Sequence, residues 1–459
     1  MSPGVPAHTP GAATRAGSTG PTATTGPAAT TGPVATSRLP AAEVVADGVL
    51  RPRADGLLEA YLPSPTVQAH AANLAVLPGG DLGCVWFGGT QEGVADICVW
   101  FSRRPDDETS PWSEPVRLSH DPDLSEQNPV LFVAPDGVLW LFWTAQRAGN
   151  QDTAVVRVRT SADAGRTWDD QRTLLAKDGE GVFVRQPPVV LPDGRWVLPT
   201  FACVPVPGER WVGDRDTSSV WVSDDAGAHW QEQPVPDSTG AVHMCVVPPA
   251  GDGGWTAFYR SRWADHVHRS TSSDGIAWSA PVPTELPNNN SSIQAVRLAG
   301  GRTAMVLNES SRLDATARRA SLYDEIDDDG IAEGAAPAVV AVAVARDEAA
   351  EVVQGGTTQD VAAPRVAFWG APRAPLTLAV SGDDGRTWPW RRVLADGDGY
   401  ALSNNSRDGL NRELSYPSVV EGADGTVHVA FTHHRRAIRY VRVPSGEVPG
   451  AGETAADRT

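Results

Sequence analysis

The sequence has few cysteines, no long apolar run and a shortage of positive charge, and each feature excludes a class of protein. Cys84, Cys98, Cys203 and Cys245 are widely separated and form no Cys-x-x-Cys pair. We therefore expect buried free thiols on strands rather than a disulfide framework or a zinc site. No uninterrupted apolar stretch is long enough to span a bilayer. The 459 residues include 38 basic and 56 acidic ones, a net charge of −18, which argues against partners such as bulk nucleic acid or an anionic membrane.

The sequence also lacks the short motifs of several large enzyme classes. It has no Gly-rich phosphate-binding loop, no nucleotide motif and no Ser-His-Asp elbow. His266 and His268 follow Asp265 and share one face of a predicted strand, a spacing compatible with metal ligation. The sequence offers no third ligand beside them, so we predict neither a metal nor another cofactor.

The two ends of the chain lack the composition of a folded domain. Residues 1–42 consist mostly of Ala, Thr, Gly, Pro and Ser, contain a near-repeat around 19–36, and have no apolar segment typical of a signal peptide. We predict a disordered low-complexity tail there and a second disordered tail at 450–459. We accordingly expect a cytoplasmic protein, although a misassigned start codon would leave secretion open.

What the chain does contain is one turn motif in four copies, with the form Ser-x-Asp-x-Gly-x-Thr-Trp. The clearest copies are 161–168 and 381–388, and the copy at 223–230 keeps all but the Thr. We align the fourth copy, 271–278, with Ser273 in the place of the Asp. Ser and Asp oxygens bond nearby backbone N–H groups and Gly takes a positive φ, so each copy predicts a hairpin turn.

This repeated motif resembles the Asp-box of the sialidase-like β-propellers. The motif Trp residues lie 62 (168 to 230), 48 (230 to 278) and 110 (278 to 388) positions apart. These steps suit four-stranded blades of roughly 40–50 residues joined by loops of variable length. A degenerate copy is expected at 102–112. The resemblance implies that the turns lie at the outer ends of blades, away from any catalytic site.

Strand-like runs follow Pro-Asp-Gly and other Gly-rich turns from about residue 66 onward. With the resemblance, they predict an all-β, six-bladed β-propeller over 43–449 with little helix. An insertion at about 310–371 interrupts the fifth blade, and we expect it to be partly disordered or to form a small lid. The predicted blades are 66–118, 126–175, 180–235, 240–285, 290–309 joined to 372–392, and 410–445.

The resemblance also implies a set of catalytic residues. Enzymes of the sialidase-like family hold a substrate carboxylate with three arginines, attack with a Tyr assisted by a Glu, and use an Asp as acid and base. Carried over to this sequence, Arg260 and Arg373 match the second and third arginines, Tyr416 the nucleophile and Asp96 the acid/base. Guanidinium groups match a carboxylate bidentately, and a neutral phenol is not repelled by the negative charge beside the anomeric carbon.

Two positions depart from the family pattern. The Arg-Ile-Pro motif that opens the family's first inner strand is missing, and His70 stands in the place of its arginine. The Glu that assists the nucleophile aligns with His243, while Glu413, three residues before Tyr416, is an alternative partner. The chain is therefore similar to a divergent member of the family, and specificity for sialic acid does not follow.

Polar residues also recur where predicted inner strands begin, which is where such strands face a propeller's central cleft. Together they predict a sugar-binding floor, to which Arg185 and Asn289 would contribute, while capping of strand ends is the alternative for each cluster. His433 to Arg436 near the end of the chain instead predict an exposed loop. The clusters are Glu126-Gln127-Asn128, Arg185-Gln186, Asn288-Asn289-Asn290 and Arg412-Glu413.

The sequence thus predicts an exo-glycosidase that releases an acidic sugar, sialic acid or a related one, from a carbohydrate partner. Two alternatives remain open. The first is a uronate-active lyase in which His70 or His243 removes a proton and Tyr416 acts as the acid. The second is a carbohydrate-binding propeller without catalysis. The sequence does not predict an oligomeric state.

Overall fold

The computed structural model of the protein describes residues 44–251, 253–319, 321–323, 325–326, 339–341 and 365–449. The chain divides into two units, Met1–Ala42 and Glu43–Thr459, and the description below concerns the second. The predicted tails at 1–42 and 450–459 lie outside the described residues, as does most of the predicted insertion.

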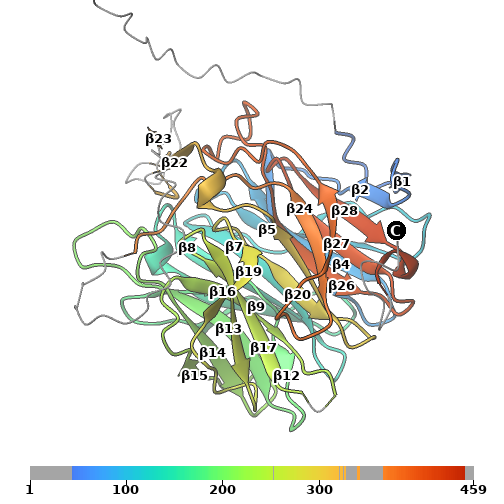
Figure 1. Ribbon diagram of the computed structural model, residues 1–459, viewed down its shortest axis with the longest axis horizontal. Helices are drawn as coiled ribbons and strands as arrows, with labels where there is room; N and C mark the ends of the chain where they lie inside the picture. The colour runs from blue at the N-terminus through green and yellow to red at the C-terminus, as the bar shows by residue number, and fades with distance from the viewer. Residues whose placement is uncertain are drawn as a thin grey trace, which may run out of the picture. The chain divides into compact units, whose positions relative to one another are not determined.

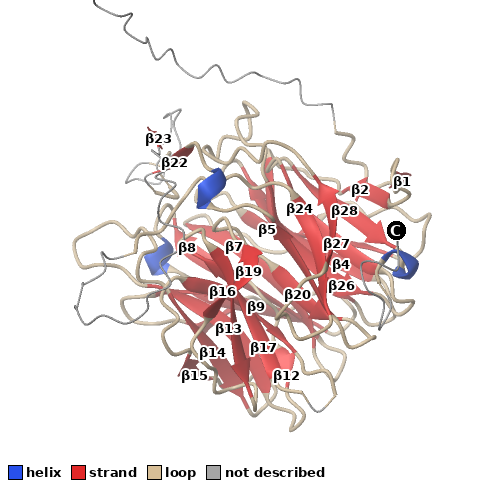
Figure 2. Ribbon diagram, in the orientation of Figure 1, coloured by secondary structure: helices blue, strands red, loops and turns tan. Residues whose placement is uncertain are grey.

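Strands dominate the described part of the chain, and its helices there are three short 3-10 turns (Figure 2). None of these is long or apolar enough to cross a membrane. The strands form six antiparallel sheets, the blades of a propeller, with a further two-stranded sheet of β22 and β23 (Figure 1). The 3-10 turns are Gln151–Thr153, Arg312–Asp314 and Ser445–Glu447, and the extra sheet joins Ala317–Arg319 to Val339–Ala341.

The blades follow one another along the chain and lie close to the predicted ranges. The first contains β3 (Gln68–Val76), β4 (Leu82–Gly89), β5 (Cys98–Arg104) and β6 (Val116–Arg117). The second contains β7 (Leu124–Val133), β8 (Leu139–Arg147), β9 (Val155–Ser161) and β10 (Arg172–Leu175). The third contains β11 (Gly181–Val184), β12 (Val189–Val190), β13 (Trp196–Cys203), β14 (Thr217–Ser223) and β15 (Gln231–Pro234).

The remaining blades hold most of the residues that the sequence singled out. The fourth contains β16 (Ala241–Val247), β17 (Trp255–Ser261), β18 (His266–Ser272) and β19 (Val282–Pro287). The fifth contains β20 (Gln294–Arg297), β21 (Thr303–Asn308), β24 (Leu376–Ser381) and β25 (Trp390–Ala395). Because β21 pairs directly with β24, the chain between them is an insertion into this blade, as predicted.

The sixth blade is closed by both ends of the described chain. Its own strands are β26 (Leu414–Glu421), β27 (Val427–His433) and β28 (Ala437–Val443). The outer partner of β28 is β2 (Leu58–Tyr61), followed by β1 (Arg51–Pro52) (Figure 1). The strands predicted from the sequence begin only at about residue 66, so this closure was not predicted. Pairing the first strand with the last covers the edge of the sixth sheet and joins the ring.

The turn motifs form the hydrogen bonds that their residue types predict. In the second blade, Ser161 Oγ accepts the Gly165 N–H at 2.8 Å, and Asp163 Oδ1 accepts the Thr167 N–H at 2.8 Å. Gly165 has a φ of 84°, which is the left-handed region that favours glycine. The same bonds recur at 223–230 and 381–388.

The fourth turn motif corrects the sequence alignment. Ser272 Oγ accepts the Gly275 N–H at 2.8 Å, and Asp274 Oδ1 accepts the backbone N–H of Ala277 at 2.9 Å. The acidic residue is therefore present at Asp274, and Ser273 does not replace it. The alignment was wrong because this turn has one residue fewer between its Ser and its Gly.

Apolar side chains fill the spaces between neighbouring blades. Trp86 and Trp143 are completely buried, and aromatic rings such as Trp140 and Trp196 meet edge to face with centroids 5.3 Å apart. All four cysteines are buried and free, and each lies on a strand, as predicted. The core therefore holds the blades together without covalent cross-links among the described cysteines.

Candidate active site

Four inner strands are irregular near their first residues, and polar side chains lie close to these irregularities at one end of the propeller. Each of four inner strands has a register shift near its start and a non-glycine residue with a positive φ at that shift. Such bulges re-aim side chains and are common beside active sites. The residues and their φ angles are Ala71 (60°), Asn128 (50°), His243 (55°) and Tyr416 (50°).

These bulges lie at the opposite end of the blades from the turn motifs. In the second blade, Gln127 pairs with Thr144 near the bulge, whereas Ser161, which opens the turn motif, pairs with Leu139 at the far end of β8. The two ends of the propeller therefore carry different kinds of residues. We refer to the end with the bulges as the cleft end.

Tyr416 lies at the cleft end among three arginines from three other blades. The phenol oxygen accepts a hydrogen bond from Arg260 Nη1 at 2.6 Å. The guanidinium carbons of Arg185, Arg260 and Arg373 lie 5.4, 5.6 and 5.6 Å from the Tyr416 ring centroid. None of the four residues is more than 7% exposed. The structure thus brings together four of the residues selected from the sequence.

Arg260 contacts neutral groups rather than a carboxylate in the described chain. Its Nε donates to Asn290 Oδ1 at 2.7 Å, and its Nη1 lies 3.5 Å from His243 Nε2. Burial lowers the pKa of Arg260 to about 9, with Tyr416 opposing that shift. The guanidinium is therefore still a cation at neutral pH, and its charge has no ionic partner among the residues described.

Arg185, like Arg260, contacts neutral groups rather than a carboxylate among the described residues. Its guanidinium donates to Ser292 Oγ at 3.2 Å and to the backbone oxygens of Ala72, Tyr416 and Pro417 at 3.0–3.3 Å. Its Nη1 is buried without a hydrogen-bond partner among the described residues. Burial lowers the pKa of Arg185 to about 10, so it too remains charged. An unpaired buried cation is costly, and an anion bound nearby would offset that cost.

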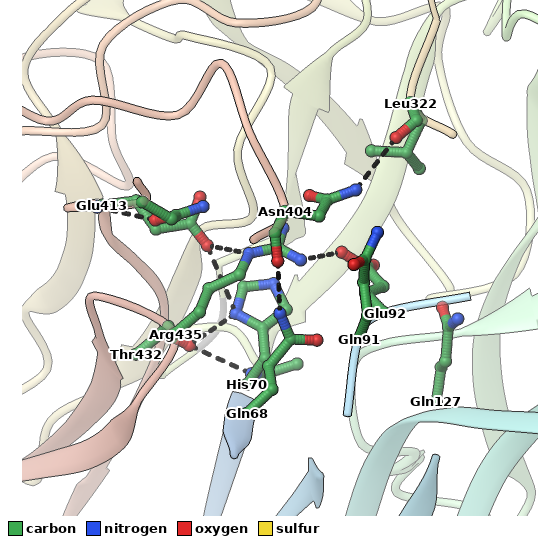
Figure 3. A network of polar contacts seen from close by, with 12 residues as sticks. Gln68, His70, Gln91, Glu92, Gln127, Leu322, Asn404, Glu413, Thr432 and Arg435 are labelled. Atoms are coloured by element: carbon green, nitrogen blue, oxygen red, sulfur yellow. Dashed lines mark hydrogen bonds and ion pairs between the residues drawn. The ribbon is translucent and has the colours of Figure 1, made fainter. Parts of the chain in front are cut away.

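Glu413 is the internal counter-ion of the other two arginines at the cleft end. Its Oε2 accepts from Arg373 Nη1 at 2.7 Å and its Oε1 from Arg435 Nε at 2.6 Å. Figure 3 shows Arg435 lying between Glu413 and Glu92, with which it also pairs. Burial alone would raise the pKa of Glu413, but the charges of Arg373 and Arg435 outweigh burial and lower that pKa. Glu413 is therefore a carboxylate.

Arg435 corrects the prediction of an exposed loop at 433–436. It is 2% exposed and lies in the three-residue turn between β27 and β28, where His434 and Arg435 have φ angles of 53° and 51°. The Ala69 N–H donates to the Arg435 backbone oxygen at 2.8 Å, which anchors this turn against the first blade. Nothing local distinguishes Arg435 from its exposed neighbour Arg436, because its burial depends on that contact between blades.

His70 lies on β3 of the first blade and packs against Tyr416. Its ring centroid lies 4.3 Å from that of Tyr416, and its Nδ1 lies 2.7 Å from Thr432 Oγ1 and 3.5 Å from Glu413 Oε1. Its Nε2 is buried, and no residue in the described part of the chain bonds to it. Burial, followed by the charge of Arg435, holds the pKa of His70 well below its usual value, so the ring is neutral.

His243 joins the same cluster, whereas Asn289 lies behind it. The His243 ring centroid is 5.8 Å from that of Tyr416, and burial and the charge of Arg260 keep its pKa well below the usual value. Asn289 Nδ2 donates to Ser310 Oγ and to the Pro372 backbone oxygen. It is the next residue, Asn290, that contacts Arg260, and a sequence of three asparagines did not distinguish them.

No described interaction joins Asp96 to Tyr416 or to the arginines around it. Its side chain is exposed on the loop between β4 and β5, and both carboxylate oxygens accept the Thr90 N–H, at 3.1 and 3.2 Å. Glu92 on the same loop points the other way and pairs with Arg435. The loop thus carries one carboxylate engaged by the cluster and one in solvent.

Two residues of the predicted polar clusters, Glu126 and Arg412, make contacts within the blades and loops. Glu126 Oε1 accepts from Trp143 Nε1 at 2.9 Å and lies 3.3 Å from Arg157 inside the second blade. Arg412 is bonded to Asp398 and stacks on Tyr400 away from Tyr416. For these residues the alternative, capping of strands and loops, describes the observed contacts.

Described parts of the insertion lie over the cleft end. The Tyr323 hydroxyl is within 3.0–3.4 Å of the side-chain amides of Gln127, Gln146 and Gln151. The Trp369 ring lies 5.7 Å from the Arg260 guanidinium. The insertion therefore supplies aromatic side chains to the surroundings of the cluster. Within the described residues, no group of three or more His, Cys, Asp or Glu side chains is arranged to hold a metal ion.

Comparison with solved structures identifies the fold. The chain is similar to the Hadza microbial sialidase Hz136 (14% identity, TM-score 0.56, 84% of this chain and 67% of that one). It is also similar to a protein of unknown function from Dyadobacter fermentans DSM 18053 (14%, 0.55, 86% and 97%). A third similar structure is the NanB sialidase from Streptococcus pneumoniae (12%, 0.55, 84% and 69%). At these identities the likeness shows the fold alone.

Comparison with protein families is more direct. A search of curated proteins gives no match. Residues 80–429, more than half of the chain, match the family described as BNR repeat-like domain. Taken with the six blades and the repeated turns, the chain therefore belongs to the BNR repeat-like domain family of sialidase-like β-propellers.

Proposed function

We propose that the protein is a glycosidase that releases an acidic sugar from the end of a glycan, with Tyr416 as its nucleophile. The observation that carries the proposal is the pair of buried guanidinium groups, Arg185 and Arg260, that lie against Tyr416 without a carboxylate partner among the described residues. A ligand carboxylate would supply the missing negative charge, and Arg260 with Arg373 would bind it.

The contacts of Tyr416 suit an attack on an anomeric carbon. Arg260 donates to the phenol oxygen and thereby stabilises negative charge that develops there. The attack would form a covalent glycosyl–tyrosine intermediate, which water then hydrolyses. A neutral phenol approaches an acidic sugar without the repulsion that a carboxylate nucleophile would meet.

Asp96 is the proposed acid and base. It would protonate the leaving oxygen in the first step and take a proton from the attacking water in the second. Its side chain is exposed on the loop between β4 and β5. Glu92 on that loop is engaged by Arg435 and is a poorer candidate for this role.

A uronate lyase is the second candidate function, and one observation favours it. His70 is neutral, and its Nε2 has no partner among the described residues, so it could remove the proton next to a uronate carboxylate. The lyase product is unsaturated and absorbs in the near ultraviolet, whereas hydrolysis creates no such chromophore.

The test is release of 4-methylumbelliferone from a panel of sialic acid, other ulosonic acid, uronic acid, rhamnose and arabinose glycosides. We expect turnover of an acidic sugar by the wild-type protein and, in Tyr416→Phe, a loss of at least about 10³-fold. Arg412→Gln, which removes an arginine whose ionic partner is the half-exposed Asp398, is the matched control and should retain activity. Full activity in Tyr416→Phe, or turnover of neutral sugars alone, would contradict the proposal.

A further inference from the structure

The nitrogen Nε2 of His70 is a buried polar atom for which the described structure provides no partner. His70 is 0% exposed, and its ring packs against the rings of Tyr416 and Phe87 at centroid distances of 4.3 and 5.2 Å. An imidazole nitrogen that is buried without a hydrogen bond carries a free-energy cost, which persists in proteins mainly where the atom is used.

The surroundings of Nδ1 determine which ring nitrogen carries the proton. Nδ1 lies 2.7 Å from Thr432 Oγ1 and 3.5 Å from the carboxylate oxygen Oε1 of Glu413 (Figure 3). A lone pair on Nδ1 would face a negative oxygen, whereas an N–H there donates to Thr432 and is stabilised by the carboxylate. The proton therefore belongs on Nδ1, which leaves a lone pair on Nε2.

Glu413 is itself held in place by its arginines. One of its oxygens is bonded to Arg373 and the other to Arg435, whose remaining contact is Glu92. The carboxylate is thus oriented from two sides and cannot turn away from His70. Thr432 adds a second fixed point, because its Oγ1 also accepts the Ala71 N–H at 3.1 Å.

The proposed function leaves one requirement open, namely a base for the phenol of Tyr416. The Glu that serves in the family aligns with His243, and Nε2 of that residue faces the Arg260 guanidinium, so its lone pair is already directed at a donor. Both oxygens of Glu413 are likewise occupied by arginines. His70 is the neighbour of Tyr416 whose basic atom has no described partner.

We propose that His70 is the base that accepts the phenol proton of Tyr416, and that Glu413 and Thr432 are the positioning residues that present Nε2 for this transfer. This inference rests on the proposed glycosidase function and adds a catalytic residue to it. It also assigns a role to the histidine found where the family's first arginine is expected.

The proton and the electron pairs balance in both steps. In the first, the Tyr416 oxygen bonds to the anomeric carbon as its proton passes to His70 Nε2, and the glycosidic bond breaks with its pair on the leaving oxygen, which takes a proton from Asp96. In the second, a water oxygen bonds to that carbon and gives a proton to Asp96. The bond to Tyr416 breaks, and its oxygen recovers the proton from His70.

The bound substrate also changes the basicity of His70. In the free protein four arginines disfavour the imidazolium, whereas Glu413 favours it. A ligand carboxylate would offset part of that positive charge, so binding raises the pKa of His70 toward its usual value and makes it a better base. The titratable and charged groups that face His70 are Arg435, Arg373, Arg185, Arg260, Glu413 and Tyr416.

The kinetic test uses the glycoside identified in the panel and two His70 variants. We expect His70→Ala to lose about 10²–10⁴-fold in kcat and to recover at least about tenfold with added imidazole, because the free base can occupy the vacated space. His70→Asn, which keeps a polar group of similar reach, should be equally slow but should not respond to imidazole. Tyr416→Phe should show no rescue either.

The positioning role is tested separately at Thr432. We expect Thr432→Ser, which retains the hydroxyl, to keep the wild-type pH profile of kcat. Thr432→Val, which has the same shape without it, should be slower and should shift the limb of that profile assigned to the base. An unshifted profile in Thr432→Val would overturn this part of the inference.

A direct measurement does not depend on turnover. Nuclear magnetic resonance of the 15N-histidine-labelled protein, with His70→Asn used to assign the signal, should show the neutral Nδ1–H form of His70. A proton on Nε2 would overturn the inference whatever the activity. If Tyr416→Phe is inactive while His70→Ala keeps its activity, or is slow but folded and unresponsive to imidazole, the inference fails and the glycosidase proposal stands. An unsaturated product would overturn both.

Discussion

The two ends of this propeller differ in how far apart in the sequence their bonded residues lie. At the end with the turn motifs, Ser, Asp and Gly bond to partners at most four positions away, as Ser381 and Asp383 do. At the cleft end, Arg260 and Tyr416 are 156 positions apart, and Glu413 binds Arg373 from 40 positions away. The motif Ser and Asp side chains are thus bonded within their own turns, whereas the cleft end depends on several blades at once.

The two ends also differ in whether their polar atoms have hydrogen-bond partners among the described residues. Each turn satisfies its own Asp, and the hydrogen bonds formed there lower the pKa of Asp163, Asp225 and Asp274. At the cleft end, the residues that the structure describes offer no hydrogen-bond partner to buried ring or guanidinium nitrogens of His70, His243 and Arg185. A turn whose Asp is hydrogen-bonded within the turn itself has a structural role. Several buried polar atoms without described partners in one place instead indicate a site for a ligand. Four variants test this contrast.

The largest expected effect on stability comes from Glu413→Gln. Removing this charge leaves Arg373 buried without a carboxylate, so we expect the free energy of unfolding to fall by about 3–5 kcal/mol. Urea denaturation measures it. Asp398→Asn, which breaks the exposed pair with Arg412, is the control and should cost less than about 1 kcal/mol. If both variants lost the same free energy of unfolding, the buried ion pairs at the cleft end would contribute no more to stability than an exposed pair on the surface.

Arg260→Lys tests the cleft end through activity rather than stability. Lysine keeps the charge but loses the planar fork that reaches both Asn290 and Tyr416, so kcat/KM should fall about 10²-fold, or about 2.7 kcal/mol. The melting temperature should change little. Arg391→Lys, at an exposed ion pair on the fifth blade, should leave the kinetics unchanged. Wild-type kinetics in Arg260→Lys would argue against a role for its fork.

Asp383→Ala should reduce stability and leave activity unchanged. The variant loses the bonds to Ser381, Arg386 and Thr387 in one turn, and we expect about 1–2 kcal/mol less stability with unchanged kcat and KM. Thermal unfolding and the glycoside assay report the two quantities. A kinetic defect in this variant would show that the turn end is coupled to the cleft end.

The smallest effect is the pH dependence of that same turn. Its hydrogen bonds lower the pKa of Asp383 below the ordinary value of 3.8 despite partial burial, so the folded state favours the ionised form. The resulting stability is present above about pH 3.8 and is lost as the pH falls through the folded pKa. Asp383→Asn should therefore be less stable than wild type near neutral pH, and the difference should shrink at about pH 3. If the difference in stability between Asp383→Asn and wild type did not depend on pH, it would come from packing rather than from the charge of Asp383.

Much of the fold was predictable because its signals are local and repeated. The turn at 161–168 and the blade boundaries follow from residue spacing, and even the split fifth blade could be placed by the turn at 381–388. The misaligned fourth turn and the missed strand β2 show the limits of this reasoning. A turn shorter by one residue defeats a fixed spacing, and a closing strand has no partner nearby in sequence.

The candidate site was predictable only where a family resemblance pointed to it. Tyr416, Arg260, Arg373 and His70 converge, yet Arg435 was predicted to be exposed and Asn290 was not separated from Asn289. Nothing in the run His433 to Arg436 indicates which side chain turns inward. That choice is made by the contact between the β27–β28 turn and the first blade.

The sequence by itself thus determined the repeat, the blades and the turn end, because each turn and each pair of adjacent strands is stabilised by residues close together in the chain. Only the tertiary structure decided which charges meet at the cleft end. Closure of the ring brings Glu413, Arg435, His70 and Tyr416 within contact distance. Burial there lowers the pKa of His70, whereas the charges of Arg373 and Arg435 lower the pKa of Glu413 against the effect of burial. Interactions of that kind depend on distance in space, which spacing along a chain does not encode.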